Sequence, residues 1–328
     1  MVPRGVTATA PGKCILFGEH AVVYGSPAVA VAIEQRMTVT LTPSTKWTVN
    51  GTPLNALKHP HIVSLMGHWG GATALEPMDI AVSGELPPAS GLGSSAALSA
   101  AFLRSLERFT DRPMTEDEAG RWAHLAEADA QQGRASPMDT STSLLGGVVV
   151  VSNRNEGDLL HRYERSLDTS EGTLAWSIHS LAAYLKGVHL VIGNTGVHAP
   201  TAKQVQRVAE RLARDPEQRQ AIDAIAAITR RGLAALKSGD AEAVGHAMSE
   251  NHIVLRSLGV SSEALERLIE AASPTSLGVK LTGAGGGGCM VALTRDPEAT
   301  ARAIESAGGT AMITAFGNPG AEASWTDA

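Results

Sequence analysis

The pattern of hydrophobic and polar positions predicts strands interrupted by two helices in the first half of the chain. Short apolar runs bounded by Gly or Pro are typical of strands, and longer periodic stretches of helices. Strands are predicted on both sides of a Pro11-Gly12 turn within residues 5–17, as a pair over 28–33 and 37–41, and over 78–83 and 148–151. The helices are predicted over 94–109 and 115–131, the second opened by the capping box Thr115-Glu-Asp-Glu118. Residues 42–77 predict only a variable segment that contains turns.

The second half of the chain alternates differently, with four helical patterns between strands. The helices are expected over 201–214, 216–237, 241–258 and 262–272, and the strands over 187–192, 278–281, 289–293 and 310–315, with a last helix over 297–307. The polar residues from the 170s to the mid-180s predict a domain boundary, which gives domains 1–182 and 183–328. The tail after Asn318 is expected to fray.

Composition narrows the class of protein. The chain has 328 residues, is 43% hydrophobic and carries a net charge of −6, with the charges well dispersed. This argues for two well-packed domains and against a nucleic-acid or anionic-membrane surface. No apolar stretch approaches a membrane span and no signal-peptide core is visible, so the cytoplasm is expected. Cys14 and Cys289 are expected to be buried free thiols, and the pair His59 and His61 to have a loop or surface role.

The segment from Pro87 to Ala97, PPASGLGSSAA, precedes a predicted helix and is typical of a phosphate cradle. Gly91 and Gly93 allow a tight turn, so the amides of residues 92–96 are able to point at one anion at the positive end of the helix. Ser94 and Ser95 add hydroxyls suited to Mg²⁺. The alternative is an ordinary helix-capping loop.

Two other phosphate loops are excluded. Residues 91–96 fit the Gly-x-Gly-x-x-Ala dinucleotide fingerprint, and Asp111 follows at a suitable distance. However, a second helix follows the first, so no strand places an acid beside a ribose. The Walker A sequence occurs nowhere in the chain.

Three further segments hold candidate chemistry. Lys13 precedes a compact polar segment, residues 18–27, that contains Glu19 and His20. Charged residues grouped in this way predict a functional site, and a surface ion pair is the alternative. Asp139 stands in a hydroxyl-rich segment, residues 132–147, which predicts a loop where it either caps a turn or accepts a proton. The glycines of 282–288 lie between two strands and predict a backbone that another group approaches closely.

These motifs, PGK with GEHAVVYG, PPASGLGSSAA and KLTGAGGGG, resemble the three signatures of the GHMP kinase superfamily in the right order. The resemblance implies an α+β GHMP kinase fold, with an N-terminal domain like the second domain of ribosomal protein S5 and a C-terminal ferredoxin-like domain. It also implies ATP and Mg²⁺. The nucleotide would contact Pro88, Ser90, Gly91, Leu92, Gly93, Ser94, Ser95 and Ala96.

Within the superfamily, GEH at 18–20 and ASPMDT around Asp139 are most similar to the members that phosphorylate the primary hydroxyl of mevalonate in isoprenoid biosynthesis. The resemblance implies that Asp139 is the base, that Lys13 polarises the hydroxyl or shields charge, and that Ser95 binds Mg²⁺. An Asp paired with Lys13 is expected to stay ionised at neutral pH. Substrate contacts are implied for Lys13, Glu19, His20, Asp139, Thr201, Gly283, Ala284 and Gly285.

Alternatives stay open at this point. A sister kinase would act on phosphomevalonate or on the 3-hydroxyl of mevalonate, and a non-catalytic sensor would bind the same ligands. The sequence does not fix the oligomeric state, a homodimer being one option.

The sequence departs from the family pattern at two positions. A metal-binding Glu eleven residues before the catalytic Asp is replaced by Ala128, and an Arg two residues before Thr201 is replaced by Ala199. Glu127 and Asp129 flank Ala128 on opposite sides of the helix. Because Glu127 has the longer reach, we predict that it joins Ser95 at the metal.

Overall fold

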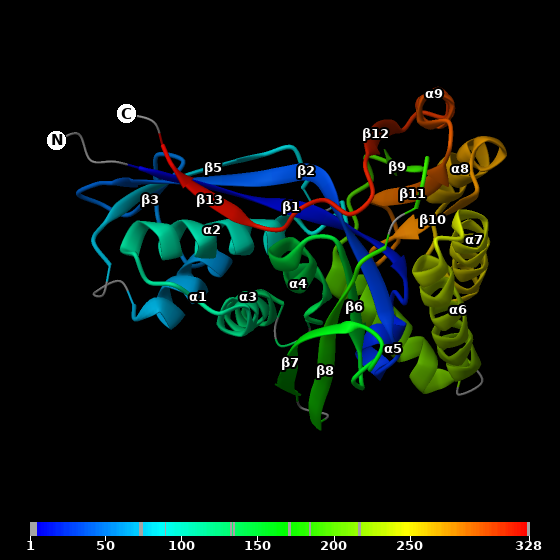
Figure 1. Cartoon of the computed structure of the whole chain (residues 1–328), viewed down its shortest axis with the longest axis horizontal. Helices are drawn as coiled ribbons and strands as arrows, with labels where there is room; N and C mark the ends of the chain where they lie inside the picture. Colours follow the sequence, from blue (N-terminus) through cyan, green and yellow to red (C-terminus); the bar gives the residue numbers. More distant parts are fainter. Residues whose placement is uncertain are drawn as a thin grey trace.

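Two β-sheets and their helices form an elongated molecule, with the first sheet extending to one side and the second packed with helices at the other (Figure 1). The computed structural model describes residues 5–71, 75–88, 90–131, 133, 135–169, 172–183, 185–215 and 218–326. No helix in these ranges is long and apolar enough to cross a membrane.

The first sheet has nine strands and contains the first and the last strand of the chain. Along its main path the order is β4-β3-β5-β2-β6-β8-β7, and β1 pairs with both β2 and β13. The strands are β1 (Val6–Phe17), β2 (Ala28–Pro43), β3 (Thr48–Val49), β4 (Thr52–Pro53), β5 (Met78–Gly84), β6 (Val148–Ser152), β7 (Leu160–Thr169), β8 (Gly172–Leu181) and β13 (Glu322–Trp325).

Strands β1 and β2 are longer than predicted. The expected turn at Pro11-Gly12 is wrong: β1 continues through it, with a shift of register between Pro11 and Lys13. Such an irregularity accommodates a proline within a ladder. The two strands expected over 28–33 and 37–41 are one strand, because Arg36 stays in the ladder opposite Pro11 and donates to the Thr9 carbonyl.

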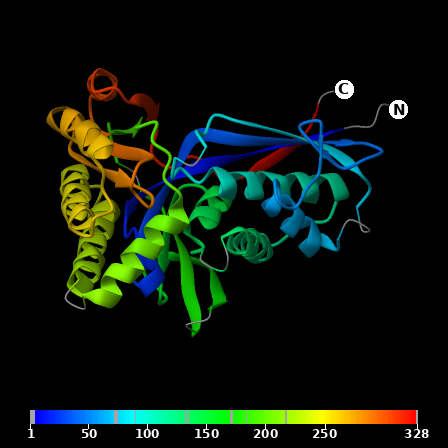
Figure 2. The ribbon, with the colours of Figure 1, turned by 180° about the vertical axis from the view of Figure 1, so that it is seen from behind.

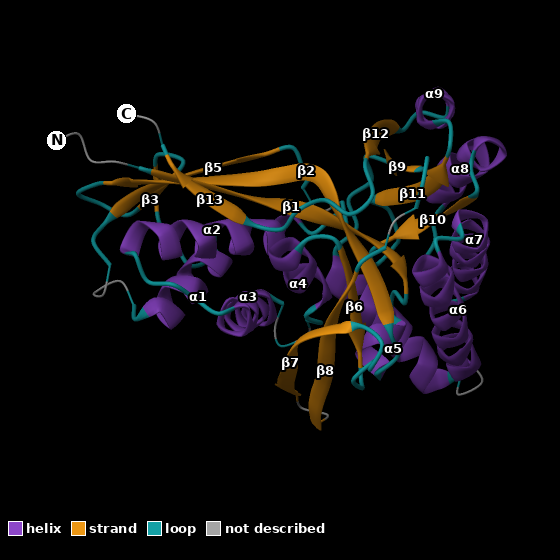
Figure 3. Cartoon of the chain, viewed as in Figure 1, coloured by secondary structure: helices purple, strands orange, loops and turns teal. Residues whose placement is uncertain are grey.

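Helices cover one face of this sheet (Figure 3). These helices are α1 (Pro60–Trp69), α2 (Ser94–Thr110), α3 (Glu116–Ala130) and α4 (Met138–Leu145), and a short 3₁₀ helix, η1 (Ala21–Tyr24), connects β1 to β2. The predictions of α2 and α3 are confirmed, and Thr115 accepts the amide of Glu118 as its capping box requires. Helix α1 was not predicted. Asp139 lies in the first turn of α4 rather than in a loop.

The second sheet has four antiparallel strands in the order β10-β11-β9-β12. Together with its helices it follows the β-α-β-β-α-β sequence of a ferredoxin-like unit. The elements are β9 (His189–Asn194), α5 (Thr201–Arg214), α6 (Arg219–Ser238), α7 (Ala241–Ser257), α8 (Glu263–Ala272), η3 (Ser273–Thr275), β10 (Gly278–Thr282), β11 (Cys289–Thr294), α9 (Pro297–Ser306) and β12 (Thr310–Thr314). The predicted helices and strands of this part are confirmed within a few residues.

Two segments differ from their predictions. Strand β8 occupies much of the polar segment in which a linker was expected, and it pairs with β6 and β7. The tail after Asn318 is not frayed over its described part, because β13 pairs with β1 and brings the C-terminus beside the N-terminal strand (Figure 2). The division into domains 1–182 and 183–328 remains a proposal.

Candidate active site

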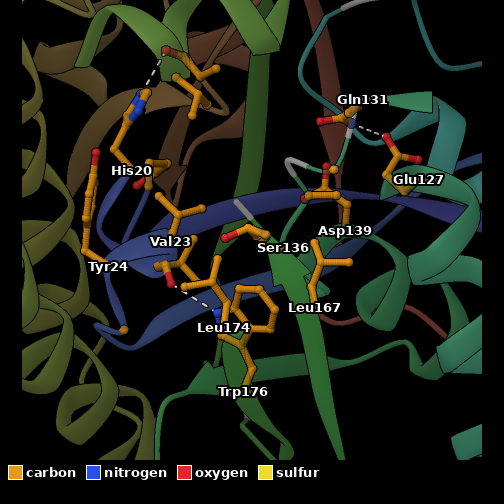
Figure 4. A pocket seen from close by; sticks show the side chains of 18 of the residues that line it. His20, Val23, Tyr24, Glu127, Gln131, Ser136, Asp139, Leu167, Leu174 and Trp176 are labelled. Carbon is orange, nitrogen blue, oxygen red and sulfur yellow. Dashed lines mark hydrogen bonds between the residues drawn. The ribbon is translucent and has the colours of Figure 1, made fainter. Parts of the chain in front are cut away.

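A pocket of about 890 Å³ opens where β1, η1, α4 and the β7–β8 hairpin meet the glycine-rich turn between β10 and β11. Its polar lining includes Lys13, His20, Glu127 and Asp139. Figure 4 shows Asp139 and Ser136 facing the same space, with Leu167, Leu174 and Trp176 along one side. The pocket therefore combines a charged centre with an apolar wall.

Lys13 and Asp139 form the charged centre. Nζ of Lys13 lies 3.0 Å from Oδ1 of Asp139, and the lysine is 2% exposed while the aspartate is 35% exposed. The same Nζ donates to the Gly91 carbonyl at 2.9 Å, and the Lys13 amide donates to the Leu92 carbonyl. The lysine is thus tied to the predicted phosphate cradle while it faces the carboxylate.

Burial raises the pKa of Asp139, and the charge of Lys13 opposes this rise without cancelling it. Burial therefore works against the predicted ionisation of Asp139 at neutral pH, which stays a prediction. A carboxylate with a raised pKa is a stronger base, and the open part of its surface faces the pocket.

The predicted phosphate cradle leads directly into α2. Gly93 is the helix N-cap with φ 74°, and a Cβ there would lie 3.0 Å from Cγ of Lys13. The amides that follow begin the helix and lack intrahelical partners, as at any helix start. Gly91 lines the pocket and also approaches Gly283, so the two glycine-rich segments meet.

The other cradle residues have different surroundings. Leu92 is buried in the core, and Ser90 donates its hydroxyl to the Pro87 carbonyl, whereas Pro88 is exposed. Their side chains are engaged or turned away, so any nucleotide contact from Ser90 or Leu92 would come from the backbone.

Glu127 lies beside Ser95. The Ser95 hydroxyl donates to Oε1 of Glu127 at 3.0 Å, and Oε2 of Glu127 lies 3.2 Å from Nε2 of His61. Burial disfavours the charged form of Glu127, but the hydrogen bond and charge of His61 and the hydrogen bond from Ser95 hold its pKa below the ordinary value. His61 has neither a loop nor a surface position: it lies in α1 and faces this carboxylate.

The neighbours of Glu127 on the helix face elsewhere. Ala128 packs in an apolar cluster with Ala135 and Met138, and Asp129 accepts a hydrogen bond from Ser64 at 2.7 Å. The residue eleven positions before Asp139 is therefore the apolar Ala128. The carboxylate that lies beside Ser95 belongs to Glu127, twelve positions before Asp139.

Glu19 and His20 are held by the glycine-rich side of the pocket. Nε2 of His20 lies 3.0 Å from the Ala284 carbonyl, which only accepts, so the imidazole donates from Nε2. Burial lowers the pKa of His20 to about 4, so the ring is neutral at pH 7. Glu19 pairs with Lys280, a buried residue for which no role was predicted.

The remaining predicted residues are placed as follows. Gly283 and Ala284 line the pocket, whereas Gly285 approaches the Val260 carbonyl. Thr201 begins α5, but its side chain lies outside the described residues.

The apolar wall of Val22, Val23, Leu167, Leu174 and Trp176 was not predicted. Leu174 and Trp176 were missed because they lie in the segment that was interpreted as a domain boundary.

Two protein-family models match parts of this chain. The model described as GHMP kinases N terminal domain matches residues 58–147, and the model described as GHMP kinases C terminal matches residues 233–312. The chain is 35% identical to a mevalonate kinase of Methanothermobacter thermautotrophicus, over 87% of this chain and 89% of that one. It is 33% identical to a mevalonate kinase of Archaeoglobus fulgidus, over 87% and 91%.

A solved structure extends the likeness to the fold. The L. major mevalonate kinase in complex with R-mevalonate superimposes with a TM-score of 0.76 at 24% identity, covering 95% of both chains. The α+β fold expected from the sequence motifs is thereby confirmed. With both family models matched and mevalonate kinases aligned over most of its length, the chain belongs to the GHMP kinase family, in its mevalonate kinase branch.

Proposed function

We propose that this chain uses ATP to phosphorylate the primary hydroxyl of (R)-mevalonate, giving 5-phosphomevalonate. The observation that carries the proposal is the 3.0 Å pair of Lys13 and Asp139, which faces a pocket at the edge of the phosphate cradle. The names of the relatives supply the acceptor. Cytoplasmic location and a homodimer remain predictions.

The residues around the pair have separable tasks in this proposal. Phosphoryl transfer depends on in-line positioning and on neutralising phosphate charge more than on covalent catalysis. Asp139 orients the acceptor hydroxyl and accepts its proton, and the Lys13 ammonium shields the charge near the Gly91 carbonyl. The neutral ring of His20 lines the acceptor side, where the apolar wall excludes water.

The donor set beside the cradle fits Mg²⁺ bound together with ATP. Ser95 and Glu127 supply hard oxygen atoms 3.0 Å apart, the type that Mg²⁺ prefers. Among the described residues no cluster of three or more His, Cys, Asp or Glu side chains forms a metal site, which suits an ion held largely by phosphates and water. When bound, Mg²⁺ would neutralise phosphate charge.

Substitution of Glu127 by Gln should raise the Mg²⁺ concentration for half-maximal rate several-fold, because a neutral amide is a weaker ligand for a hard cation. Titration of Mg²⁺ at saturating ATP measures the effect. Asp129→Asn is the matched control and should be near neutral, since Asp129 bonds to Ser64 on α1. The reverse ranking, or no change in Glu127→Gln, would show that Glu127 does not contribute to holding the metal.

A coupled ADP-release assay tests the substrate. We expect turnover with mevalonate and little with phosphomevalonate or homoserine. If phosphomevalonate or homoserine were turned over in preference to mevalonate, the acceptor would be that compound, and the ATP-dependent kinase activity would stand. Absence of turnover with all three, in protein that binds ATP, would favour the sensor hypothesis.

A further inference from the structure

Lys280 is a lysine without solvent exposure in β10 of the second sheet. Its Nζ pairs with Oε1 of Glu19, and it also donates to the Leu281 carbonyl at 2.6 Å and to the Ile15 carbonyl at 3.4 Å. Glu19 and Ile15 belong to the first part of the chain. The ammonium group therefore joins the second sheet to the segment that carries the predicted substrate residues.

Glu19 is held on both of its carboxylate oxygens by the second part of the molecule. Oε2 accepts from Nδ2 of Asn251 in α7 at 3.2 Å, and Asn251 is also fully buried. The Glu19 side chain is 1% exposed. Both of its oxygens are thus engaged by the second part of the molecule, and Glu19 also lines the pocket.

The next residue, His20, has an unusual backbone conformation. Its φ is 62° and its ψ is −35°, in a region that non-glycine residues rarely occupy. Such conformations persist only where several surrounding contacts hold the backbone in place, and they cluster at functional sites. Here the neighbouring side chain is fixed by Lys280 and Asn251, and the His20 ring bonds to the Ala284 carbonyl.

We propose that Lys280 is a positioning residue for the acceptor side of the active site, acting through Glu19 to hold the strained backbone that presents His20 to the pocket. The proposal rests on the kinase function proposed above. It does not place Lys280 in contact with either substrate. The nucleotide side has a link of its own, from the Lys13 amide to the Leu92 carbonyl.

Because the nucleotide side has this separate link, we expect a substitution of Lys280 to affect the acceptor and not ATP. In Lys280→Met we expect kcat/KM for the acceptor to fall by about 10²-fold, the scale of a misplacement of about 1 Å. The dissociation constant for ATP, measured without acceptor, should stay within about twofold, because the cradle contacts are untouched. Lys237→Met is the matched control, since it removes a lysine paired with Asp158 at the surface, and should leave both constants unchanged.

A second variant separates positioning from stability. Lys280→Met leaves the Glu19 carboxylate buried without its cation, which lowers the melting temperature. The double variant Lys280→Met with Glu19→Gln removes both charges, and neutral replacement of a buried pair is often tolerated. We expect the double variant to regain most of the melting temperature but not the acceptor kcat/KM.

Three results would overturn the proposal: unchanged acceptor kinetics in folded Lys280→Met, recovery of kcat/KM together with stability in the double variant, or failure of the double variant to fold. The assay uses whichever acceptor the wild-type protein turns over, so a wrong substrate assignment does not decide it. A readout independent of turnover is the ¹⁵N NMR signal of the His20 ring, assigned with His20→Gln. It should shift in both Lys280 variants and not in Lys237→Met.

Discussion

Substitution of Asp139 by Asn should lower kcat by about 10²-fold or more, the usual scale for losing a general base, while nucleotide affinity stays nearly intact. The amide keeps the shape of the side chain but accepts no proton. Asp139 belongs to α4 and pairs with Lys13, whereas the cradle residues precede α2, so ATP should still bind. Steady-state kinetics with both substrates and a binding isotherm for ATP measure the two effects.

The pH profile of the wild-type protein provides a companion measurement. A base acts when deprotonated, so the rate should rise with pH as Asp139 loses its proton. Since burial raises its pKa, the midpoint of this acid limb should lie above about 3.9, the ordinary value for Asp. The limb should disappear in Asp139→Asn.

Asp168→Asn is the matched control for Asp139→Asn. Asp168 lines the same pocket, but its carboxylate accepts a hydrogen bond from Thr173 within the β7–β8 hairpin. We expect its kcat to change little. If Asp139→Asn retained more than about a third of wild-type turnover, Asp139 would not be the base.

Substitution of Lys13 by Met should lower kcat by a similar factor, about 10²-fold, for two reasons. It removes the ammonium that shields developing charge beside the Gly91 carbonyl. It also removes the cation that lowers the pKa of Asp139, so burial would raise that pKa further. At neutral pH a larger fraction of Asp139 would then be protonated and unable to act as a base.

The second reason gives Lys13→Met a distinct signature. The acid limb of its pH–rate profile should move to higher pH, and part of the lost rate should return as the pH rises. Lys237→Met, at a surface ion pair, should keep the wild-type profile. An unshifted limb in Lys13→Met would contradict the coupling between Lys13 and Asp139.

Local signals in the sequence predicted much of the fold. The capping box of Thr115 gave the start of α3, and the apolar runs gave the second sheet. Helix α4 was missed because four of its eight residues are Ser or Thr, which compete with the backbone for hydrogen bonds and favour turns. In the fold, Thr142 instead donates to the Met138 carbonyl one turn earlier, so its hydroxyl is satisfied within the helix.

The candidate site was predicted where its chemistry lies within a motif. Lys13, Asp139 and the cradle each stand in a recognisable segment, and the fold places them together. Glu127 was predicted from the reach of its side chain, and the fold places it beside Ser95, whereas the family spacing alone selects Ala128. Its role at a metal stays a prediction. Lys280 is a single charge in an apolar strand, and its partner Glu19 lies 261 positions away, so the ion pair leaves no local signal.

Phosphorus NMR of the product tests the central claim most directly, because it reports which hydroxyl receives the phosphoryl group. After reaction of the wild-type protein with ATP and (R)-mevalonate, the new phosphorus signal should couple to the two protons of a CH₂ group, as required for a phosphate on the primary hydroxyl. A signal without that coupling, from a phosphate on the tertiary carbon, would contradict the account. So would an absence of product from mevalonate while another alcohol is phosphorylated.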